Sequence, residues 1–87
     1  MTPSLNPSLF DVLVLSLGNA ALVGLGLMSE PGVQTTAVDL QATEYNIELL
    51  EMLQKKTRGN LSPDEQKMID GLLYDLRLKY VDAKRRV

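Results

Sequence analysis

The chain has 87 residues, of which 45% are apolar and 23% are charged, and a formal net charge of −2. This composition excludes wholesale disorder, and a chain of this length forms one small domain that buries only about 60 to 65% of its unfolded surface. The chain contains neither cysteine nor histidine, which excludes disulfides, thiol chemistry and the usual ligands of transition metals, so we expect no cofactor and no metal.

The most apolar stretch follows a short flexible leader, residues 1–6. Asn6 and Pro7 are typical of a helix N-cap and a first helical position, and they predict a helix over residues 7–28. Of the 20 positions from 9 to 28, 14 are apolar and none is basic. A helix that is apolar on every side has to be covered by other protein or by lipid.

Small residues recur in this helix every four positions, at Ser16, Ala20 and Gly24. Such a line lets a second helix approach closely. Two interpretations are open: the line is an interface between subunits, or it fits a tight core within one subunit. In the first interpretation, the interface consists of Leu13, Ser16, Leu17, Ala20, Val23, Gly24 and Leu27.

Residues 29–38 are predicted to be a linker, because Pro31 and Gly32 strongly favour a turn. Asp39 is suited to cap a second helix, predicted over residues 39–57. One apolar face of this helix contains Leu40, Ile47, Leu50 and Leu53. Glu51 stands four residues before Lys55, the favourable spacing for an ion pair within a helix.

The sequence TRGNLSPDE, residues 57–65, predicts a tight turn between two helices. Gly59 suits the left-handed position after a helix, while Ser62 and Glu65 form the two halves of a capping box around Pro63. The residues expected to form the turn are Gly59, Asn60, Ser62, Pro63 and Glu65. Its glycine spacing matches no phosphate-binding motif.

A third helix is predicted over residues 62–84, followed by a frayed tail at 85–87. Its apolar positions include Met68, Ile69, Leu72, Leu76, Tyr80 and Ala83. Because the connecting turn is short, the second and third helices should form an antiparallel hairpin that packs on the first helix. We therefore expect one all-α domain over residues 1–87, completed by oligomerisation.

Acidic and basic residues are unevenly distributed. Residues 1–54 contain six acidic residues and no base, whereas residues 55–87 contain five acidic residues and all nine bases. Lys79, Lys84, Arg85 and Arg86 could contact phosphate, with Tyr74 and Tyr80 nearby, but basic residues at a helix C-terminus commonly have only a structural role. We expect no nucleic-acid partner.

Residues 49–81, LLEMLQKKTRGNLSPDEQKMIDGLLYDLRLKYV, together with the preceding apolar LVLSLGNAALVGLG, resemble a bacterial family of small helical proteins whose domain has no known function. The segments that carry the resemblance are the EMLQ-KT-GNL stretch and the LLYDLR stretch. The resemblance implies a small bacterial protein without an established activity or cofactor, and it assigns no catalytic or binding residue.

The sequence gives little reason to expect an enzyme. Without histidine or cysteine, the candidate groups are carboxylates, lysines and tyrosines. Asp11 in the apolar helix is explained by its place in the first turns, where the helix dipole favours a negative charge. Asp75 and Arg77 are two residues apart and do not face each other, so Asp75 should pair with Lys79.

Two hypotheses account for the apolar first helix. In the first, the chain is a cytoplasmic structural or interaction module that pairs with itself, most simply as a dimer, or with another helical protein. Covering the half of the helix that a monomer leaves exposed would contribute about 10 kcal/mol. In the alternative, residues 9–28 anchor the protein to a membrane, but this stretch lacks flanking basic or Trp/Tyr anchors.

Overall fold

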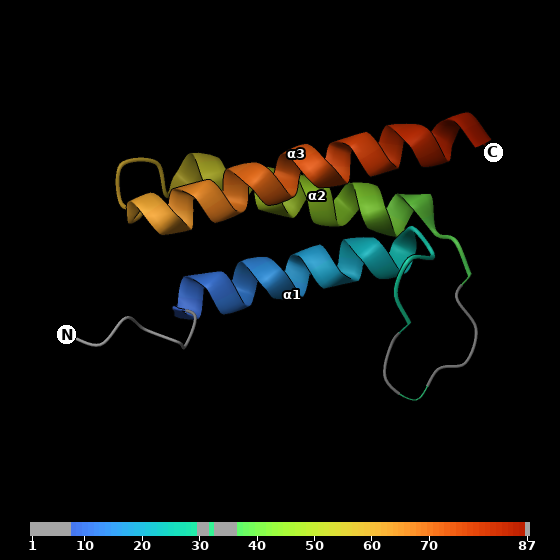
Figure 1. Cartoon of the computed structure of the whole chain (residues 1–87), viewed down its shortest axis with the longest axis horizontal. Helices are drawn as coiled ribbons and strands as arrows, with labels where there is room; N and C mark the ends of the chain where they lie inside the picture. The colour runs from blue at the N-terminus through green and yellow to red at the C-terminus, as the bar shows by residue number, and fades with distance from the viewer. Residues whose placement is uncertain (1–7, 30–31, 33–36, 87) are drawn as a thin grey trace.

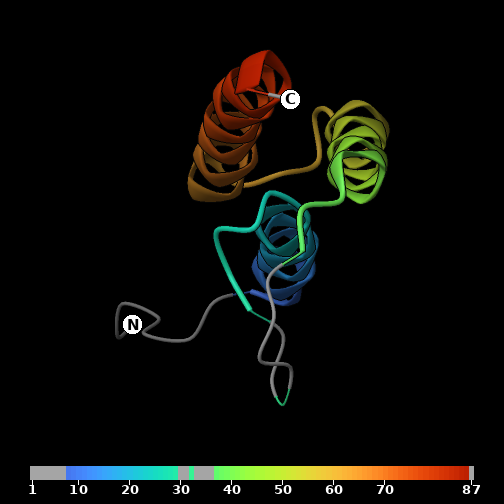
Figure 2. The same cartoon turned by 90° about the vertical axis from the view of Figure 1, so that its right-hand side faces the viewer.

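The computed structural model describes residues 8–29, 32 and 37–86. Within these residues the chain forms three helices and no strand: α1 (Leu9–Gly24), α2 (Leu40–Lys56) and α3 (Pro63–Arg86). The predicted all-α fold is confirmed. α1 and α3 run in the same direction and α2 runs opposite to both (Figure 1). Seen end-on, the three helices lie at the corners of a triangle (Figure 2).

α1 begins at a different cap from the one predicted. Ser8 is the N-cap, because its hydroxyl accepts a hydrogen bond from the backbone N–H of Asp11 at 3.1 Å. The predicted cap, Asn6, and the predicted first helical residue, Pro7, lie outside the described residues. The N-terminal boundary of the helix is therefore Leu9, and Ser8 takes the role that the sequence pattern gave to Asn6.

α1 also ends earlier than predicted. The helix stops at Gly24, and Gly26 adopts a φ of 76°, a left-handed conformation that ends a helix. The prediction that the helix continues to Met28 was wrong, because the apolar composition continues through residues 25–28 while the backbone turns. Of the predicted linker 29–38, residues 30, 31 and 33–36 lie outside the described part of the chain.

α2 and α3 lie close to their predicted positions. Asp39 caps α2, its carboxylate accepting a hydrogen bond from the Ala42 N–H at 3.1 Å. α3 continues two residues beyond the predicted end, so Arg85 and Arg86 are helical rather than a frayed tail. Val87 lies outside the described residues.

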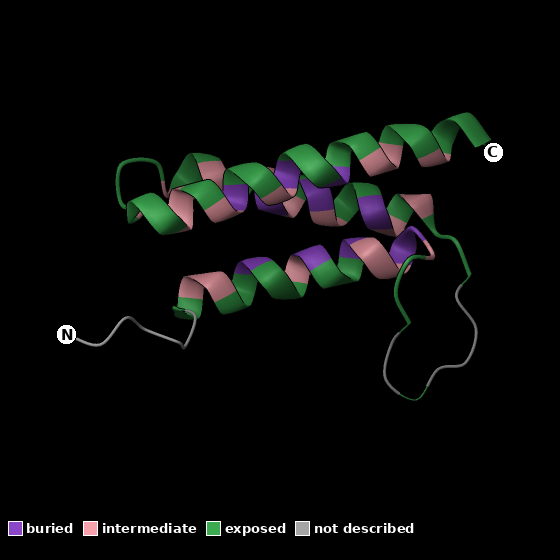
Figure 3. Ribbon diagram, viewed as in Figure 1, coloured by how far each residue is buried: buried purple, intermediate pink, exposed green. Residues whose placement is uncertain are grey.

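The core lies between the three helices. Each helix contributes side chains that are three or four residues apart in the sequence and therefore lie on one face of the helix. The buried apolar residues are Val14, Ala21, Leu25, Ile47, Leu50, Ile69, Leu73 and Leu76. α1 buries only the side that faces α2 and α3, and its opposite side is exposed along most of its length (Figure 3).

Candidate interaction surface on the first helix

Glu65 joins the starts of two helices. Its Oε1 accepts a hydrogen bond from the Ser62 backbone N–H at 2.9 Å, and its Oε2 accepts one from the Ser8 hydroxyl at 2.7 Å. The backbone donor of Ser62, followed by the hydroxyl of Ser8, lowers the pKa of the Glu65 carboxyl below its usual value. This one side chain therefore holds the N-terminus of α1 against that of α3.

The turn between α2 and α3 has the geometry that its sequence predicts. Gly59 has a φ of 86°, and the Asn60 N–H donates to the Thr57 carbonyl at 2.9 Å. The Ser62 hydroxyl accepts from the Glu65 N–H at 3.2 Å, which completes the capping box, and Pro63 is the first residue of α3. All five predicted turn residues therefore have structural roles.

Gly24 lies where α1 meets the start of α2. A Cβ atom at this position would overlap the Thr43 hydroxyl oxygen and stand 2.8 Å from the Asp39 carbonyl oxygen. The Asp39 N–H donates to the Gly24 carbonyl at 2.7 Å, so the backbones themselves are in contact. Gly24 is therefore part of the core of one chain and is not available to a second copy.

Thr43 is the buried polar residue at this junction. Its hydroxyl donates to the carbonyls of Ala21 at 3.1 Å and Asp39 at 3.3 Å. Thr43 was not predicted from the sequence, because a lone threonine between helical apolar positions resembles a solvent-facing residue. Its position is the signal that could have found it: Thr43 lies four residues before Ile47, on the apolar face of α2.

Gly18 allows α1 to approach α3. A Cβ atom on Gly18 would lie 2.8 Å from the Leu72 Cδ2 atom, closer than real contacts allow. The close approaches within the chain therefore use Gly18 and Gly24 on the inner side of α1. Ser16 and Ala20, the other members of the predicted line of small residues, are exposed. The interpretation as a tight core within one subunit therefore holds at Gly24, whereas Ser16 and Ala20 lie on the surface.

The opposite side of α1 is what we call the outer face. Its residues recur at intervals of three and four: Leu9, Leu13, Ser16, Ala20 and Val23. Leu27 follows after the end of the helix and is also exposed. Leu9 is 89% exposed, Leu13 46% and Leu27 60%. Val12 and Leu15, which flank this face, are also exposed. The outer face carries no charged residue, which is unusual for a helix that meets solvent.

The seven predicted interface residues divide into three groups. Leu13, Ser16, Ala20 and Leu27 are exposed; Leu17 and Val23 are half-buried; and Gly24 is buried. Leu17 packs against the core of its own chain. The structure therefore leaves Leu13, Ser16, Ala20, Val23 and Leu27 on the surface that a partner could contact, and it adds Leu9, which the prediction omitted.

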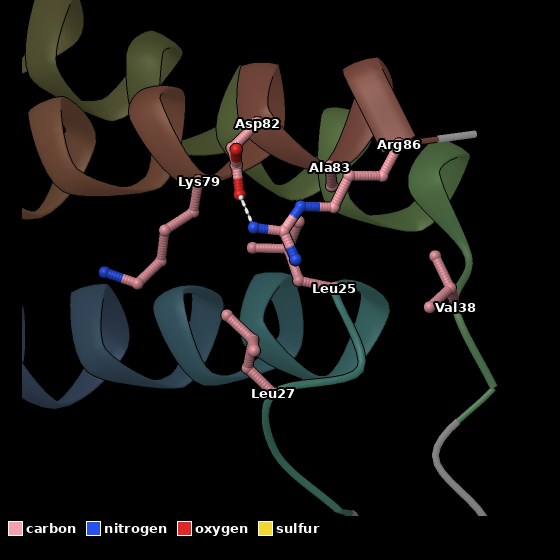
Figure 4. A pocket seen from close by; sticks show the side chains of 7 residues that line it. All are labelled: Leu25, Leu27, Val38, Lys79, Asp82, Ala83 and Arg86. Atoms are coloured by element: carbon pink, nitrogen blue, oxygen red, sulfur yellow. Dashed lines mark ion pairs between the residues drawn. The ribbon is translucent and has the colours of Figure 1, made fainter.

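A cavity of about 390 Å³ opens beside the C-terminal end of α1. Its apolar lining comes from three parts of the chain: Leu25 and Leu27 after α1, Val38 before α2, and Ala83 of α3. Lys79, Asp82 and Arg86 form the charged side of the cavity (Figure 4). Arg86 and Asp82 are paired at 3.1 Å, so the charged groups of this rim partly neutralise each other.

The exposed side of the α2–α3 hairpin mixes apolar residues such as Met52 and Leu78 with charged residues, which the outer face lacks. Arg77 of α3 pairs with Glu51 of α2 at 2.8 Å, so Glu51 does not form the predicted pair with Lys55. The Tyr80 hydroxyl donates to the Glu44 carboxylate at 2.6 Å, and this hydrogen bond raises the pKa of Tyr80 above its usual value. The acidic first half of the chain thus contacts the basic second half.

The basic C-terminal residues are largely engaged within α3. Lys79 pairs with Asp75 at 2.6 Å, as predicted, and Arg86 pairs with Asp82. The Lys84 amino group lies 5.5 Å from the centre of the Tyr80 ring. These contacts are the structural role expected for cations near a helix C-terminus.

The described residues contain no group of three or more acidic residues placed to hold a metal ion. No helix of the described residues has the length and apolar character needed to cross a bilayer. In α1, Asp11 is the single charged residue, and its buried Oδ1 atom has no hydrogen-bond partner.

Comparison with known proteins identifies a family but not an activity. No curated protein and no solved structure is significantly similar to the chain. A family model described as a domain of unknown function, DUF1844, matches residues 7–82, which include all of α1 and α2 and most of α3. The chain therefore belongs to the DUF1844 family of domains of unknown function.

Proposed function

We propose that this chain is a non-enzymatic interaction module that self-associates through the outer face of α1, most simply as a two-fold dimer. The observation that supports this most directly is the exposure of Leu9 and Leu13 on the uncharged outer face of α1, with Leu27 exposed just beyond the end of the helix. Isolated apolar side chains are normal on a protein surface, but a contiguous apolar face commonly marks an interaction site.

A second copy of the same chain is the partner that best fits this face. In a two-fold dimer each face meets itself, so any charged group near the axis would meet the same charge on the other chain. The outer face has no such group. The α2–α3 hairpin, by contrast, carries Glu44, Glu51 and Arg77 on its surface and suits contact with water.

The test is the molar mass of the purified chain, measured by light scattering after size exclusion at micromolar concentration. We expect twice the chain mass for the natural protein and a single chain mass for the Leu13→Glu variant. In that variant, dimerisation would bury the introduced carboxylate of each chain, without a partner, against the apolar face of the other chain, which costs several kcal/mol.

Leu78→Glu is the matched control. Leu78 is 54% exposed on α3, close to the 46% of Leu13, but it lies outside the outer face. We expect this variant to remain dimeric, and circular dichroism should show unchanged helix content in both variants. A natural protein that elutes with a single chain mass across this concentration range would overturn the proposal.

A further inference from the structure

We infer that the cavity beside the C-terminal end of α1 binds a small amphipathic anion, an aliphatic carboxylate of medium chain length. Its hydrocarbon chain lies on Leu25, Leu27 and Val38, and its carboxylate accepts hydrogen bonds from Arg86. The site lies within one chain, so the inference does not depend on self-association through the outer face. Three features support it: the apolar wall, the size of the cavity and the charges at its rim.

The end of α1 forms the apolar wall of the cavity. The Leu27 N–H donates to the Leu22 carbonyl at 3.0 Å, and the Gly26 N–H donates to the Val23 carbonyl at 2.9 Å, the paired hydrogen bonds of a Schellman motif. After this turn, Leu25 and Leu27 both line the cavity. Because these terminal carbonyls already accept backbone donors, the negative end of the α1 dipole is partly neutralised where an anion would lie.

The cavity has the size and the apolar surface of a small-molecule site. Its volume of about 390 Å³ lies within the range of about 300 to 1,000 Å³ that is typical of ligand pockets, which are mostly apolar with a few polar groups. Leu25 is buried, whereas Leu27 and Val38, on either side of it in Figure 4, are more than half exposed. A hydrocarbon chain that covered these two side chains would remove apolar surface from water.

Arg86 supplies hydrogen-bond donors for an anionic head group. Its side chain extends from the end of α3 toward Leu25 (Figure 4). The ion pair with Asp82 involves one guanidinium nitrogen, Nη2, at 3.1 Å, and both side chains are well exposed, so this pair contributes little to stability. Because a guanidinium has five N–H donors in a planar fork, Arg86 can bind the carboxylate of a ligand while it keeps or releases Asp82.

The charge of the rim matches an anion with a single negative charge. Among the lining residues, Lys79 and Arg86 are positive and Asp82 is negative, which gives a sum of +1. The Lys79 amino group pairs at 2.6 Å with Asp75, which lies outside the lining, so Arg86 is the direct contact. A carboxylate neutralises the charge of the rim, whereas a phosphate monoester, with a charge of about −1.5 to −2, exceeds it.

Isothermal titration calorimetry tests the head group with probes that share one hydrocarbon chain: decanoate, decanol, decylamine and decyl phosphate, each below its micelle concentration. We expect decanoate to bind about tenfold more tightly than decanol, and decylamine to bind most weakly. The absence of decanoate binding would overturn the inference. Decanol or decylamine that binds as tightly as decanoate, or decyl phosphate that binds more tightly, would overturn it equally.

Two matched pairs of variants test the location of the site. Arg86→Gln should weaken decanoate binding about tenfold, whereas Arg85→Gln, which removes the same charge outside the cavity lining, should leave it unchanged. Val38→Glu should bind decanoate more weakly than Val38→Gln, which has a side chain of the same size without the charge. Leu13→Glu should bind decanoate like the natural chain, because Leu13 lies outside the cavity. Equal effects within either pair, or loss of binding in Leu13→Glu, would overturn the inference.

Discussion

Gly24 has no side chain to accommodate, and this is what lets α2 begin directly beside the end of α1. The Asp39 backbone donates to its carbonyl, and Thr43 donates to Ala21 one turn earlier. Residue type at these positions is therefore set by backbone contact within the chain. The sequence alone did not decide this, because a line of small residues fits an intramolecular and an intermolecular contact equally well.

Gly24→Ala should destabilise the fold by about 1 to 3 kcal/mol, since its Cβ would overlap the Thr43 hydroxyl and the Asp39 carbonyl. Gly71→Ala is the control. A Cβ on Gly71, inside α3, meets nothing within 4 Å, so this variant should gain about 0.5 to 1 kcal/mol from helix propensity. Urea unfolding measures both. Equal effects of the two substitutions would contradict the close approach at Gly24.

Thr43→Val keeps the shape of the buried side chain and removes its hydroxyl. The variant loses the hydrogen bonds to the carbonyls of Ala21 and Asp39, and we expect a loss of about 1 kcal/mol in the free energy of unfolding. Thr57→Val is a comparison at the C-cap of α2, because the Thr57 hydroxyl donates only to the Leu53 carbonyl near the exposed turn. An unchanged stability of Thr43→Val would show that burial of the methyl group, and not the hydroxyl, determines the residue at 43.

At the scale of the helices, capping residues predicted the ends of α2 and α3 to within two residues. The signals at Asp39, Gly59 and Ser62 are local, because each acts through a hydrogen bond or φ angle within its own turn. The ends of α1 were predicted less well. Apolar composition continues past Gly24 whether the backbone is helical or not, so hydrophobicity alone could not locate the turn at Gly26.

Glu65→Gln should reduce stability at neutral pH and have progressively less effect in acid. The folded pKa of Glu65 is lowered, so its carboxylate contributes fully above its unfolded pKa near 4.5, and the contribution disappears as the pH falls through the lower folded value. The difference in unfolding free energy between the natural chain and the variant should therefore be greatest above that pH and shrink below it.

The control for this pH dependence is Asp64→Asn, one residue earlier in the same turn of α3. Among the hydrogen bonds of the described residues, the Asp64 carboxylate accepts neither the Ser8 nor the Ser62 donor. We expect its effect on stability to vary less with pH, as measured by urea unfolding from neutral to acid conditions. A parallel pH profile for the two variants would contradict the role of Glu65 as the link between α1 and α3.

At the scale of the whole molecule, three helices in a triangle leave one side of each helix exposed, and the character of that side differs. α2 and α3 place charged pairs there beside exposed apolar residues such as Met52 and Leu78, whereas the outer face of α1 carries leucines and no charged residue. The sequence predicted an apolar first helix and most of its outer face. It could not reveal the cavity, whose lining joins Leu27, Val38 and Ala83 from three separate segments.

If the chain folds and dimerises through the outer face of α1 in one step, its thermal stability depends on protein concentration. Because the dimer unfolds to two chains, a tenfold rise in concentration contributes about 1.4 kcal/mol per dimer, or about 0.7 kcal/mol per chain. For a domain of this size, 1 kcal/mol shifts the midpoint of thermal unfolding by about 4 to 8 °C, so we expect a rise of about 3 to 5 °C for each tenfold increase.

Leu13→Glu should unfold at a lower temperature that does not change with concentration, while Leu78→Glu should keep the slope of the natural chain. Calorimetry over two decades of concentration measures this, and a flat profile for the natural chain would show that the outer face of α1 contributes nothing to stability through association.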